Sequence, residues 1–354
     1  MRAVWISRHG GPEVLELRES PDKVPIAGEV RIRAAACGMN FAELMARQGL
    51  YPDAPKAPCV VGYEAAGTID AVGAGVDRGF IGKRVVVLSR FGAHADQVCV
   101  PQAYAFPIPD EMSFEEAAAI PVNYLTAYQM LFRVASIRPG ESVLIHMAAG
   151  GVGLAVLQLC RTVEGIITFG TASASKHDVI RANGCIHPID YHTTDYFTEI
   201  MRLTNGKGVD VVLDALGGND WRKGYRLLRP VGRLVAFGFA NMSSGNTRKI
   251  WRMIRQLVTV PLFTPMGLMD KNRSVAGVNL GHLWDDSFLP AAMNKLLILY
   301  REGQIKPHID SELPIRAGGA GSPAPPGGEE YRQGRAGAVT ERREEGFTRP
   351  NRTT

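Results

Sequence analysis

The residues best suited to chemistry form the glycine-rich stretch Met147–Gly153. It follows the apolar run Ser142–His146, which is typical of a buried strand, and leads into Val152–Val163, which is expected to be a helix. Glycines let the backbone approach a pyrophosphate, and a helix N-terminus offers free N–H groups and the positive end of a dipole. The stretch therefore predicts the phosphate-binding loop of a dinucleotide site, with a tight structural turn as the alternative. The predicted contacts are Ala149, Gly150, Gly151, Val152 and Gly153.

The residues that follow the loop bear on which dinucleotide binds. An NAD site usually places a carboxylate about 20 residues after the loop, on the ribose 2′-hydroxyl. The corresponding stretch here, Gly170–Lys176, has hydroxyls and a lysine but no acid. Lys176 would attract a 2′-phosphate, so we predict NADPH, the alternative being a solvated lysine at a helix start. The predicted contacts are Thr171, Ser173, Lys176 and Tyr191.

Two kinds of pattern divide the chain. Residues 1–122 are rich in alternating strands such as Val30–Ala34, Gly67–Val72 and Arg84–Leu88, which predicts a barrel-like domain. A capping box at Ser113–Glu116 then opens a helix. From residue 142 on, strands alternate with helices, which predicts an α/β domain with a doubly wound parallel sheet. The later strands are expected at Ile166–Phe169, Val209–Leu213 and Arg233–Phe237, followed by a helix at Ala291–Arg301 and a strand at Lys306–Leu313.

Composition narrows the class of protein. A length of 354 residues favours two domains, and 45% hydrophobic with 21% charged residues is ordinary for a globular chain. There is no run of 18 apolar residues and no secretory signal, so we expect no integral membrane contact. The net charge of +5 comes without a dense basic block, which argues against nucleic-acid binding. Five scattered cysteines without Cys-x-x-Cys indicate reduced thiols and a cytoplasmic protein.

Three motifs resemble a known family. Cys37–Tyr51, Gly62–Gly67 and the glycine loop resemble the medium-chain dehydrogenase/reductase superfamily, in its zinc-free quinone oxidoreductase group. The stretches 241–245 and 275–280 resemble its vesicle amine transport protein branch. The resemblance covers residues 1 to about 315 and implies a GroES-like catalytic domain with an inserted Rossmann domain, and usually a dimer. We expect the catalytic domain at 1–122, the Rossmann domain at 123–265, and at 266–315 its end and the return to the catalytic domain.

The resemblance also bears on zinc. Zinc members of the superfamily hold the ion with Cys, His and a second Cys or Asp. Cys37 is retained here, but Tyr63 replaces the His, and Asn123 stands near the third position. A neutral phenol is a poor ligand and one thiolate cannot hold the ion alone. We therefore expect no metal site, which disfavours a zinc alcohol dehydrogenase.

Candidate catalytic residues follow from the same resemblance. Asn40 and Tyr51 match family positions near the substrate, where Tyr51 could donate to a developing oxyanion. A satisfied structural polar group is the alternative for each. Glu43 stands where the family commonly has Asp, which puts a role there in doubt. Asn123 and Thr126 are expected on the nicotinamide side, and Gly238 and Phe239 are assigned to cofactor binding.

Two functions remain open at this stage. The first is an NADPH-dependent reductase of a quinone or activated enone, since these acceptors spread charge without a metal. The second is an NADPH-binding protein with little turnover that acts as an adaptor or membrane-associated scaffold. The basic stretch Arg248–Arg255 could touch an anionic membrane, although a solvated helix face is the simpler interpretation.

The C-terminal segment 316–354 differs from the rest. It is rich in Gly, Pro, Arg and Glu with almost no aliphatic residues, which predicts disorder. Family members end instead with a helix and a strand of the type Gly-Lys-Val-Val-Leu. One choice of codons for residues 321–336, read one base later, encodes EAQRLLEEKNIGKVVL, which is such a helix and strand. We expect a frameshift product by mutation or sequencing error, which the nucleotide sequence of the gene tests.

Overall fold

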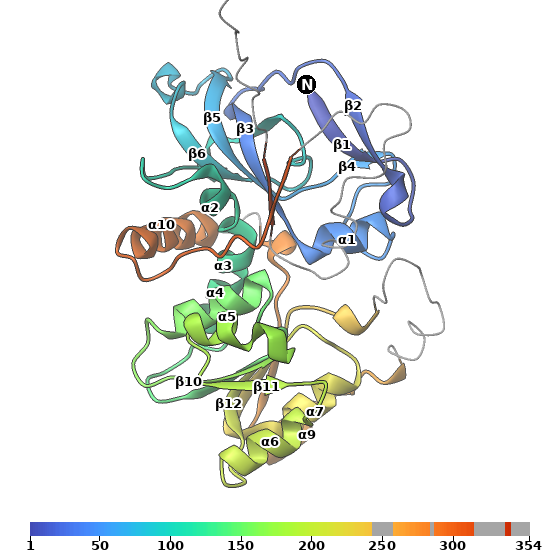
Figure 1. Cartoon of the computed structure of the whole chain (residues 1–354), viewed down its shortest axis with the longest axis vertical. Helices are drawn as coiled ribbons and strands as arrows, with labels where there is room; N and C mark the ends of the chain where they lie inside the picture. The colour runs from blue at the N-terminus through green and yellow to red at the C-terminus, as the bar shows by residue number, and fades with distance from the viewer. Residues whose placement is uncertain (243–257, 284–286, 315–336, 341–354) are drawn as a thin grey trace, which may run out of the picture.

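The computed structural model describes residues 1–242, 258–283, 287–314 and 337–340. Two lobes are stacked along the long axis of the molecule (Figure 1). One lobe carries the first eight strands, and the other carries the sheet that includes β10, β11 and β12. Helix α3 (Pro121–Tyr128), which continues into the π-helical stretch Gln129–Val134, lies between them. The expected pair of domains is therefore present.

The first lobe is built on strand β3 (Glu29–Met39), which pairs along both of its edges. One edge pairs with β5, and the other pairs with β7 in its first half and β16 in its second half. Strands β15 (Glu312–Pro314) and β16 (Gly337–Thr340) also belong to this sheet. The seven-stranded sheet has the order β15-β16-β3-β5-β6-β8, with β7 paired with β3 off this path, and β2-β1-β4 form a second sheet. The remaining elements of this lobe are β1 (Arg2–Ile6), β2 (Leu15–Glu19), α1 (Phe41–Arg47), β4 (Cys59–Val60), β5 (Glu64–Val72), β6 (Arg84–Leu88), β7 (Gln97–Pro101), β8 (Ala105–Pro107) and α2 (Phe114–Ala118).

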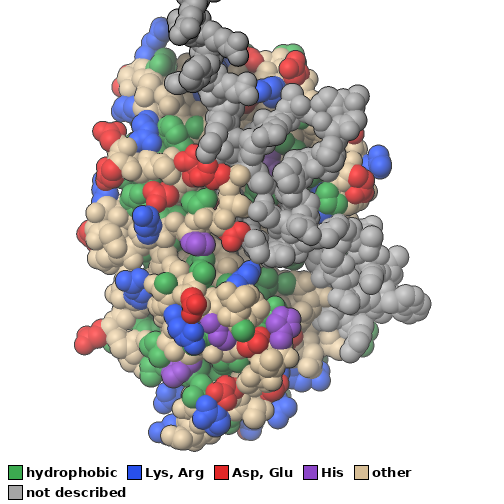
Figure 2. Space-filling model, viewed as in Figure 1, with side chains coloured by type: hydrophobic (Ala, Val, Ile, Leu, Met, Phe, Trp, Pro, Cys, Tyr) green, Lys and Arg blue, Asp and Glu red, His purple; other side chains and the backbone are tan. Residues whose placement is uncertain are grey.

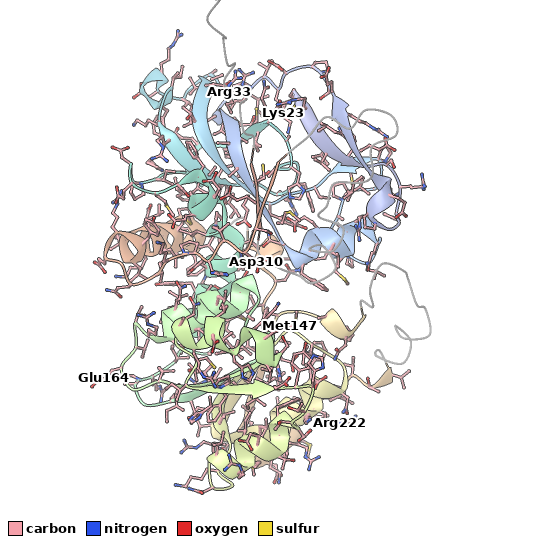
Figure 3. All side chains as sticks on the ribbon, viewed as in Figure 1. Lys23, Arg33, Met147, Glu164, Arg222 and Asp310 are labelled. Atoms are coloured by element: carbon pink, nitrogen blue, oxygen red, sulfur yellow. The ribbon has the colours of Figure 1, made fainter. Side chains whose placement is uncertain are left out.

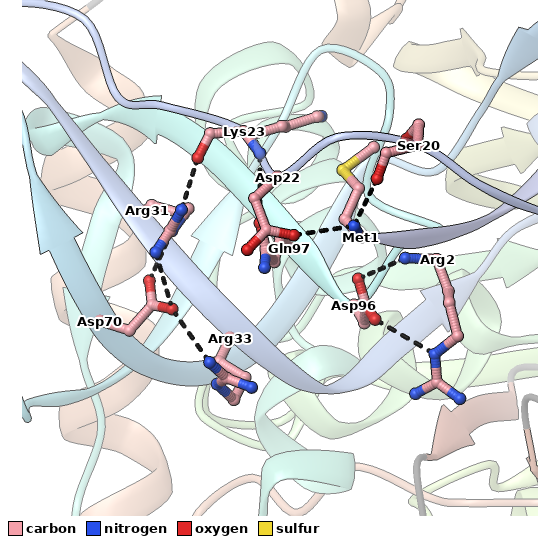
Figure 4. Close-up of polar contacts among 10 residues, drawn as sticks. All are labelled: Met1, Arg2, Ser20, Asp22, Lys23, Arg31, Arg33, Asp70, Asp96 and Gln97. Carbon is pink, nitrogen blue, oxygen red and sulfur yellow. Dashed lines mark hydrogen bonds and ion pairs between the residues drawn. The ribbon is translucent and has the colours of Figure 1, made fainter.

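Polar contacts fasten the outer edge of this lobe. The amino group of Met1 donates to the Ser20 carbonyl at 2.6 Å and to Asp22 at 2.8 Å (Figure 4). On the neighbouring strands, Arg31 pairs with Asp70 at 2.8 Å.

The Ser113 hydroxyl accepts from the Glu116 N–H at 3.1 Å, which confirms the predicted helix start.

The second lobe is a doubly wound parallel sheet with the strand order β11-β10-β9-β12-β13-β14. Its central strands β9 and β12 are almost wholly buried because helices cover both faces. They are β9 (Ser142–Ile145), β10 (Ile167–Ala172), β11 (His187–Asp190), β12 (Val209–Asp214), β13 (Leu228–Ala236) and β14 (Ser274–Gly277). The helices are α4 (Gly151–Cys160), α5 (His177–Ala182), α6 (Tyr196–Leu203), α7 (Asn219–Leu227) and α9 (Pro265–Lys271). The predicted GroES-like and Rossmann folds are both confirmed.

Helix α10 (Phe288–Arg301) returns the chain to the junction and packs beside α3 (Figure 1). Its buried side chains belong to the same apolar cluster as those of α3 and α4. The Phe288 ring lies 5.9 Å from the Tyr128 ring, and the Tyr300 hydroxyl donates to Glu116 at 2.6 Å. One side of the junction is thus a continuous hydrophobic core.

The structure corrects two expectations near the C-terminus. Lys306–Leu313 is not one strand, because strand β15 covers only Glu312–Pro314. The Gln158 side chain instead bonds the N–H and the carbonyl of Lys306, each at 2.8 Å, in place of a strand neighbour. Disorder does not hold for Gly337–Thr340, which forms β16, because the free edge of β3 offers backbone groups to any extended segment. The rest of the predicted disordered tail, residues 316–336 and 341–354, lies outside the described residues.

Candidate functional site

A cavity of about 640 Å³ opens at the carboxyl ends of the strands of the parallel sheet. We call it the strand-end cavity. Six predicted cofactor residues line it: Ala149, Gly150, Thr171, Ser173, Lys176 and Tyr191. Ligands of open α/β sheets bind at this edge, because the loops and helix N-termini that follow the strands converge there. Met147, which is labelled in Figure 3, also lines the cavity.

The glycine loop has the form that the sequence predicted. It follows β9, and Gly150 is the N-cap of α4. A Cβ on Gly153 would lie 2.5 Å from the Met147 carbonyl oxygen, so only glycine fits where the helix turns against the loop. A Cβ on Gly151 would lie 2.5 Å from Oδ1 of Asn123. The α4 N-terminus can therefore approach a phosphate group, as in other dinucleotide sites.

The other predicted cofactor residues lie outside the cavity wall. Asn123 packs against Gly151, and Thr126 lies one turn further along α3, where both are buried. Val152 and Gly153 belong to the first turn of α4, below the loop. Gly238 packs against Ala215, and the Phe239 ring covers Gly217 and lies 5.0 Å from Trp221.

Several cavity residues were missed by the sequence analysis. They are mostly polar residues that follow β11, β12 and β13: His192, Thr193, Thr194, Asp195, Tyr196, Asp220, Lys223 and Asn241. Their position after the strands was a usable signal, because the ends of all parallel strands meet at one edge. Asp220 accepts from the Tyr196 hydroxyl and from the Asn241 amide, each at 2.9 Å, and Lys223 pairs with Asp195.

A buried pair lies at the wall of the cavity. Nε2 of His146 is 4.0 Å from Oδ2 of Asp214, and both side chains are fully buried. Burial lowers the pKa of His146 and raises the pKa of Asp214, so both groups resist ionisation. The other oxygen of Asp214 accepts from the Leu216 and Gly217 N–H groups at 2.7 and 3.0 Å. This bond pattern fixes the turn after β12.

The predicted catalytic residues Asn40 and Tyr51 lie in the other lobe and do not line the strand-end cavity. Asn40 is the N-cap of α1 and donates its amide to Glu64 at 2.7 Å. The second oxygen of Glu64 accepts from the Val122 N–H at 2.7 Å, in the first turn of α3. Glu64 thus joins the start of α1 to the start of α3, a connection that the sequence did not indicate.

Glu43 lies in the same buried region as Glu64. Its carboxylate accepts from the Asn40 N–H at 2.7 Å. Burial raises the pKa of Glu43 to about 8, with the Glu64 charge as a further cause, and burial raises the pKa of Glu64 to about 7. Glu43 therefore has a structural role, because it caps the start of α1.

The residues at the expected zinc positions make other contacts. Cys37 donates its thiol to the Ala93 carbonyl at 2.9 Å, and burial raises the pKa of this thiol to about 12. The Tyr63 ring packs 5.3 Å from Phe91 and edge-on to Tyr51, and burial raises the pKa of its hydroxyl. Within the described ranges, no group of three or more His, Cys, Asp and Glu side chains could hold a metal ion.

Known proteins share this arrangement. Residues 26–110 match the alcohol dehydrogenase GroES-like domain, and residues 151–297 match the family described as zinc-binding dehydrogenase. The chain is 49% identical over 318 residues to the synaptic vesicle membrane protein VAT-1 homolog of Rattus norvegicus, covering 89% of this chain and 78% of that protein. The chain belongs to the medium-chain dehydrogenase/reductase superfamily. The predicted resemblance to this superfamily and to its vesicle-protein branch is confirmed.

Solved structures of the superfamily superpose on the whole fold. Escherichia coli quinone oxidoreductase complexed with NADPH matches with a TM-score of 0.81 and 29% identity, over 96% of this chain and 100% of that chain. The CurK enoyl reductase matches with a TM-score of 0.79 and 28% identity, over 96% and 99% of the two chains. This medium-chain protein therefore has oxidoreductases among its structural neighbours.

The buried acid pair gives a pH-dependent prediction. A carboxyl whose folded pKa is about 8 rather than 4.5 binds more protons folded than unfolded, so stability falls as pH rises between these values. Replacing Glu43 with Gln removes this titration. The fall in the free energy of unfolding between pH 6 and pH 9 should then be smaller than in wild type by roughly 1–3 kcal/mol. Urea unfolding at both pH values measures it, with the exposed Glu19→Gln as control. Parallel declines in wild type and Glu43→Gln would contradict the assignment.

Proposed function

We propose that this protein is a zinc-independent, NADPH-dependent oxidoreductase that reduces a quinone or an activated enone. The observation that carries the proposal is the strand-end cavity, which brings the glycine loop together with Ser173, Lys176 and Tyr191. The neighbours described as a quinone oxidoreductase with NADPH and as an enoyl reductase support the cofactor and the acceptor class. When bound, the reduced nicotinamide supplies hydride.

The charges around the cavity favour a phosphate-bearing cofactor. Asp195 is paired with the Lys223 cation, whereas the donors to Asp220 are the neutral Tyr196 hydroxyl and Asn241 amide. A phosphate is therefore favoured at the Lys176 wall rather than beside Asp220. Lys176 forms no ion pair with any residue that the structure describes, and Ser173 and Tyr191 stand at the same wall. A 2′-phosphate would complete this set through charge-assisted hydrogen bonds.

Lys176→Ala tests the cofactor. Losing one charge-assisted bond costs about 1.5–3 kcal/mol, so the Kd for NADPH should rise about 10- to 100-fold while NADH binding stays unchanged. Fluorescence titration with each cofactor measures the two values, and Lys207→Ala on an exposed turn serves as control. Equal losses for NADPH and NADH would show that Lys176 does not contact a 2′-phosphate.

Zinc independence is proposed from the chemistry of the side chains. A thiol with a pKa of about 12 that donates to a carbonyl is protonated at neutral pH, and zinc binds the thiolate. Tyr63 offers a neutral phenol in place of an imidazole. A quinone or an enone delocalises the negative charge that reduction creates, so an orienting site with hydrogen-bond donors suffices.

The chain's own residues have distinct proposed roles. The glycine loop and the α4 N-terminus hold the pyrophosphate, and Asn123 and Thr126 on α3 orient the nicotinamide side. Asn40 forms part of the side of the site that the catalytic lobe supplies. Tyr51 donates a hydrogen bond to the oxyanion of the acceptor. Burial, with the Asp53 charge next, raises the pKa of Tyr51, so its hydroxyl keeps its proton at neutral pH.

Turnover with Tyr51→Phe tests the activity. Wild type should oxidise NADPH with at least one member of a panel of quinones and enones, and Tyr51→Phe should lower kcat about 10- to 100-fold with an unchanged NADPH Kd. Tyr128→Phe, whose ring packs on Phe132 at 4.7 Å, is the control. Wild-type NADPH binding without turnover on any acceptor would refute the enzyme proposal.

A second candidate function is an NADPH-binding adaptor at a membrane surface. Four large apolar side chains before and on α9 are strongly exposed: Val258 at 78%, Leu262 at 89%, Met266 at 81% and Met269 at 75%. The rat relative is named a synaptic vesicle membrane protein. The basic stretch 248–255 lies outside the described residues, and no described helix is long and apolar enough to span a bilayer.

Vesicle binding tests this second candidate. Wild type should sediment with vesicles that contain phosphatidylserine, and the double variant Leu262→Glu/Met266→Glu should lose at least half of this binding because charge cannot enter the acyl region. Ile298→Glu on α10 is the matched control. Equal sedimentation of wild type and double variant would remove the surface from consideration.

Two coarser assignments complete the proposal. All five cysteines are free thiols, which supports the cytoplasm as the compartment. Strand β14 ends the parallel sheet and pairs only with β13 among the described strands, so a second copy could extend the sheet as a homodimer. On the face in Figure 2, Lys, Arg, Asp and Glu side chains are interspersed, which gives no support to a nucleic-acid surface.

A further inference from the structure

The loop that carries Tyr51 touches the other lobe at one point. The Tyr51 ring packs against the cluster of Ile6, Val14 and Val61 in its own lobe. Its hydroxyl lies 3.5 Å from where a Cβ on Gly281 would stand. Gly281 belongs to the short 3-10 turn Leu280–His282, which directly follows β14 of the parallel sheet. Tyr51 therefore spans from one lobe to the other.

Polar groups join the same loop to the same turn. Oδ2 of Asp53 is 2.9 Å from Nε2 of His282 and 3.5 Å from Nδ2 of Asn279. Oδ1 of Asn279 accepts from the Gly281 N–H at 3.0 Å, which leaves its amide nitrogen facing Asp53. The turn is itself anchored, because the Val278 N–H donates to the Ala236 carbonyl at 2.9 Å.

We propose that Asp53, Asn279 and His282 form a polar clasp between the two lobes that fixes the position of the Tyr51 hydroxyl. The proposal rests on the proposed function of Tyr51 and adds positioning residues supplied by the cofactor-binding lobe. Exposed polar pairs are weak, so the clasp biases the junction without locking it. Such a contact suits a site that has to open for cofactor and acceptor.

The clasp also acts on the charge near Tyr51. Burial raises the pKa of Tyr51 most, and the Asp53 carboxylate raises it next. Tyr63, Glu43 and Asn279 also act on this hydroxyl. Removing the carboxylate in Asp53→Asn should lower that pKa, whereas His282→Ala leaves the carboxylate in place and should leave that pKa unchanged. Two residues that only support the fold would not separate in this way, with one variant shifting the pKa of Tyr51 and the other leaving it unchanged.

The test compares Asp53→Asn with His282→Ala in the full chain. Both should lower kcat about two- to fivefold at saturating NADPH, with the NADPH Kd within twofold of wild type. The alkaline limb of the kcat profile should move to lower pH in Asp53→Asn and should stay in place in His282→Ala. Asp70→Asn, which breaks the Arg31–Asp70 pair within the catalytic lobe (Figure 4), should do neither.

Amide hydrogen exchange gives a readout that needs no turnover. The Ala54 N–H bonds to the Tyr51 carbonyl at 3.1 Å, and its exchange should quicken in Asp53→Asn and His282→Ala but not in Asp70→Asn. Unchanged exchange, or wild-type kcat with an unmoved alkaline limb in both variants, overturns the clasp. If wild type turns over no quinone or enone, the proposed function fails, and faster exchange in the two variants still supports the clasp.

Discussion

The carboxyl group of Glu64 connects the two chain segments on which the candidate site depends. One oxygen holds the Asn40 amide at the start of α1, the helix that leads to Tyr51. The other holds the Val122 N–H at the start of α3, which carries Asn123 against the glycine loop. A buried donor left without its acceptor costs about 1–3 kcal/mol, so losing this carboxyl would loosen both segments together.

The same region stores an electrostatic conflict. Glu43 and Glu64 are both about 1% exposed, and burial raises the pKa of each. Their stabilising partners are N–H donors of Asn40 and Val122 rather than cations. Neutral donors favour a carboxylate less than a positive charge would, so protonation relieves the conflict. The chain holds its two helix starts in register at the expense of stability at alkaline pH.

Local signals account for what the sequence could predict. A few neighbouring residues suffice to predict the glycine loop, Ser173, Lys176 and the capping residue Ser113. Turn geometry and helix N-termini depend on such neighbours. The types of the elements were also predictable. Apolar residues alternate with a period of two in the first part of the chain, whereas apolar strand segments alternate with helical segments in the later part. Strand ends remained uncertain, as Lys306 shows, where a glutamine side chain from α4 replaces a strand partner.

Contacts between distant residues could not be predicted in this way. In the sequence, Glu64 is recognised only as part of the motif Gly62–Gly67. The folded chain brings it to Val122, 58 positions away. His146 directly follows β9 and Asp214 ends β12, two strands that are neighbours in the sheet but far apart in sequence, so their pairing depends on strand order. Asp53 and His282 are separated by 229 positions and by the whole cofactor-binding lobe.

The division of labour between the lobes follows from where these residues lie. The strand-end cavity is lined by residues of the parallel-sheet lobe, whereas Asn40 and Tyr51 belong to the other lobe. Under the proposed function, cofactor affinity is therefore set within one lobe, while alignment of the reacting groups depends on the junction. That junction is apolar where α10 packs on α3, and it is polar and exposed at Asp53 and His282. Because close-packed side chains resist separation more than a solvated polar pair does, relative motion of the lobes should pivot at α3 and open on the Tyr51 side.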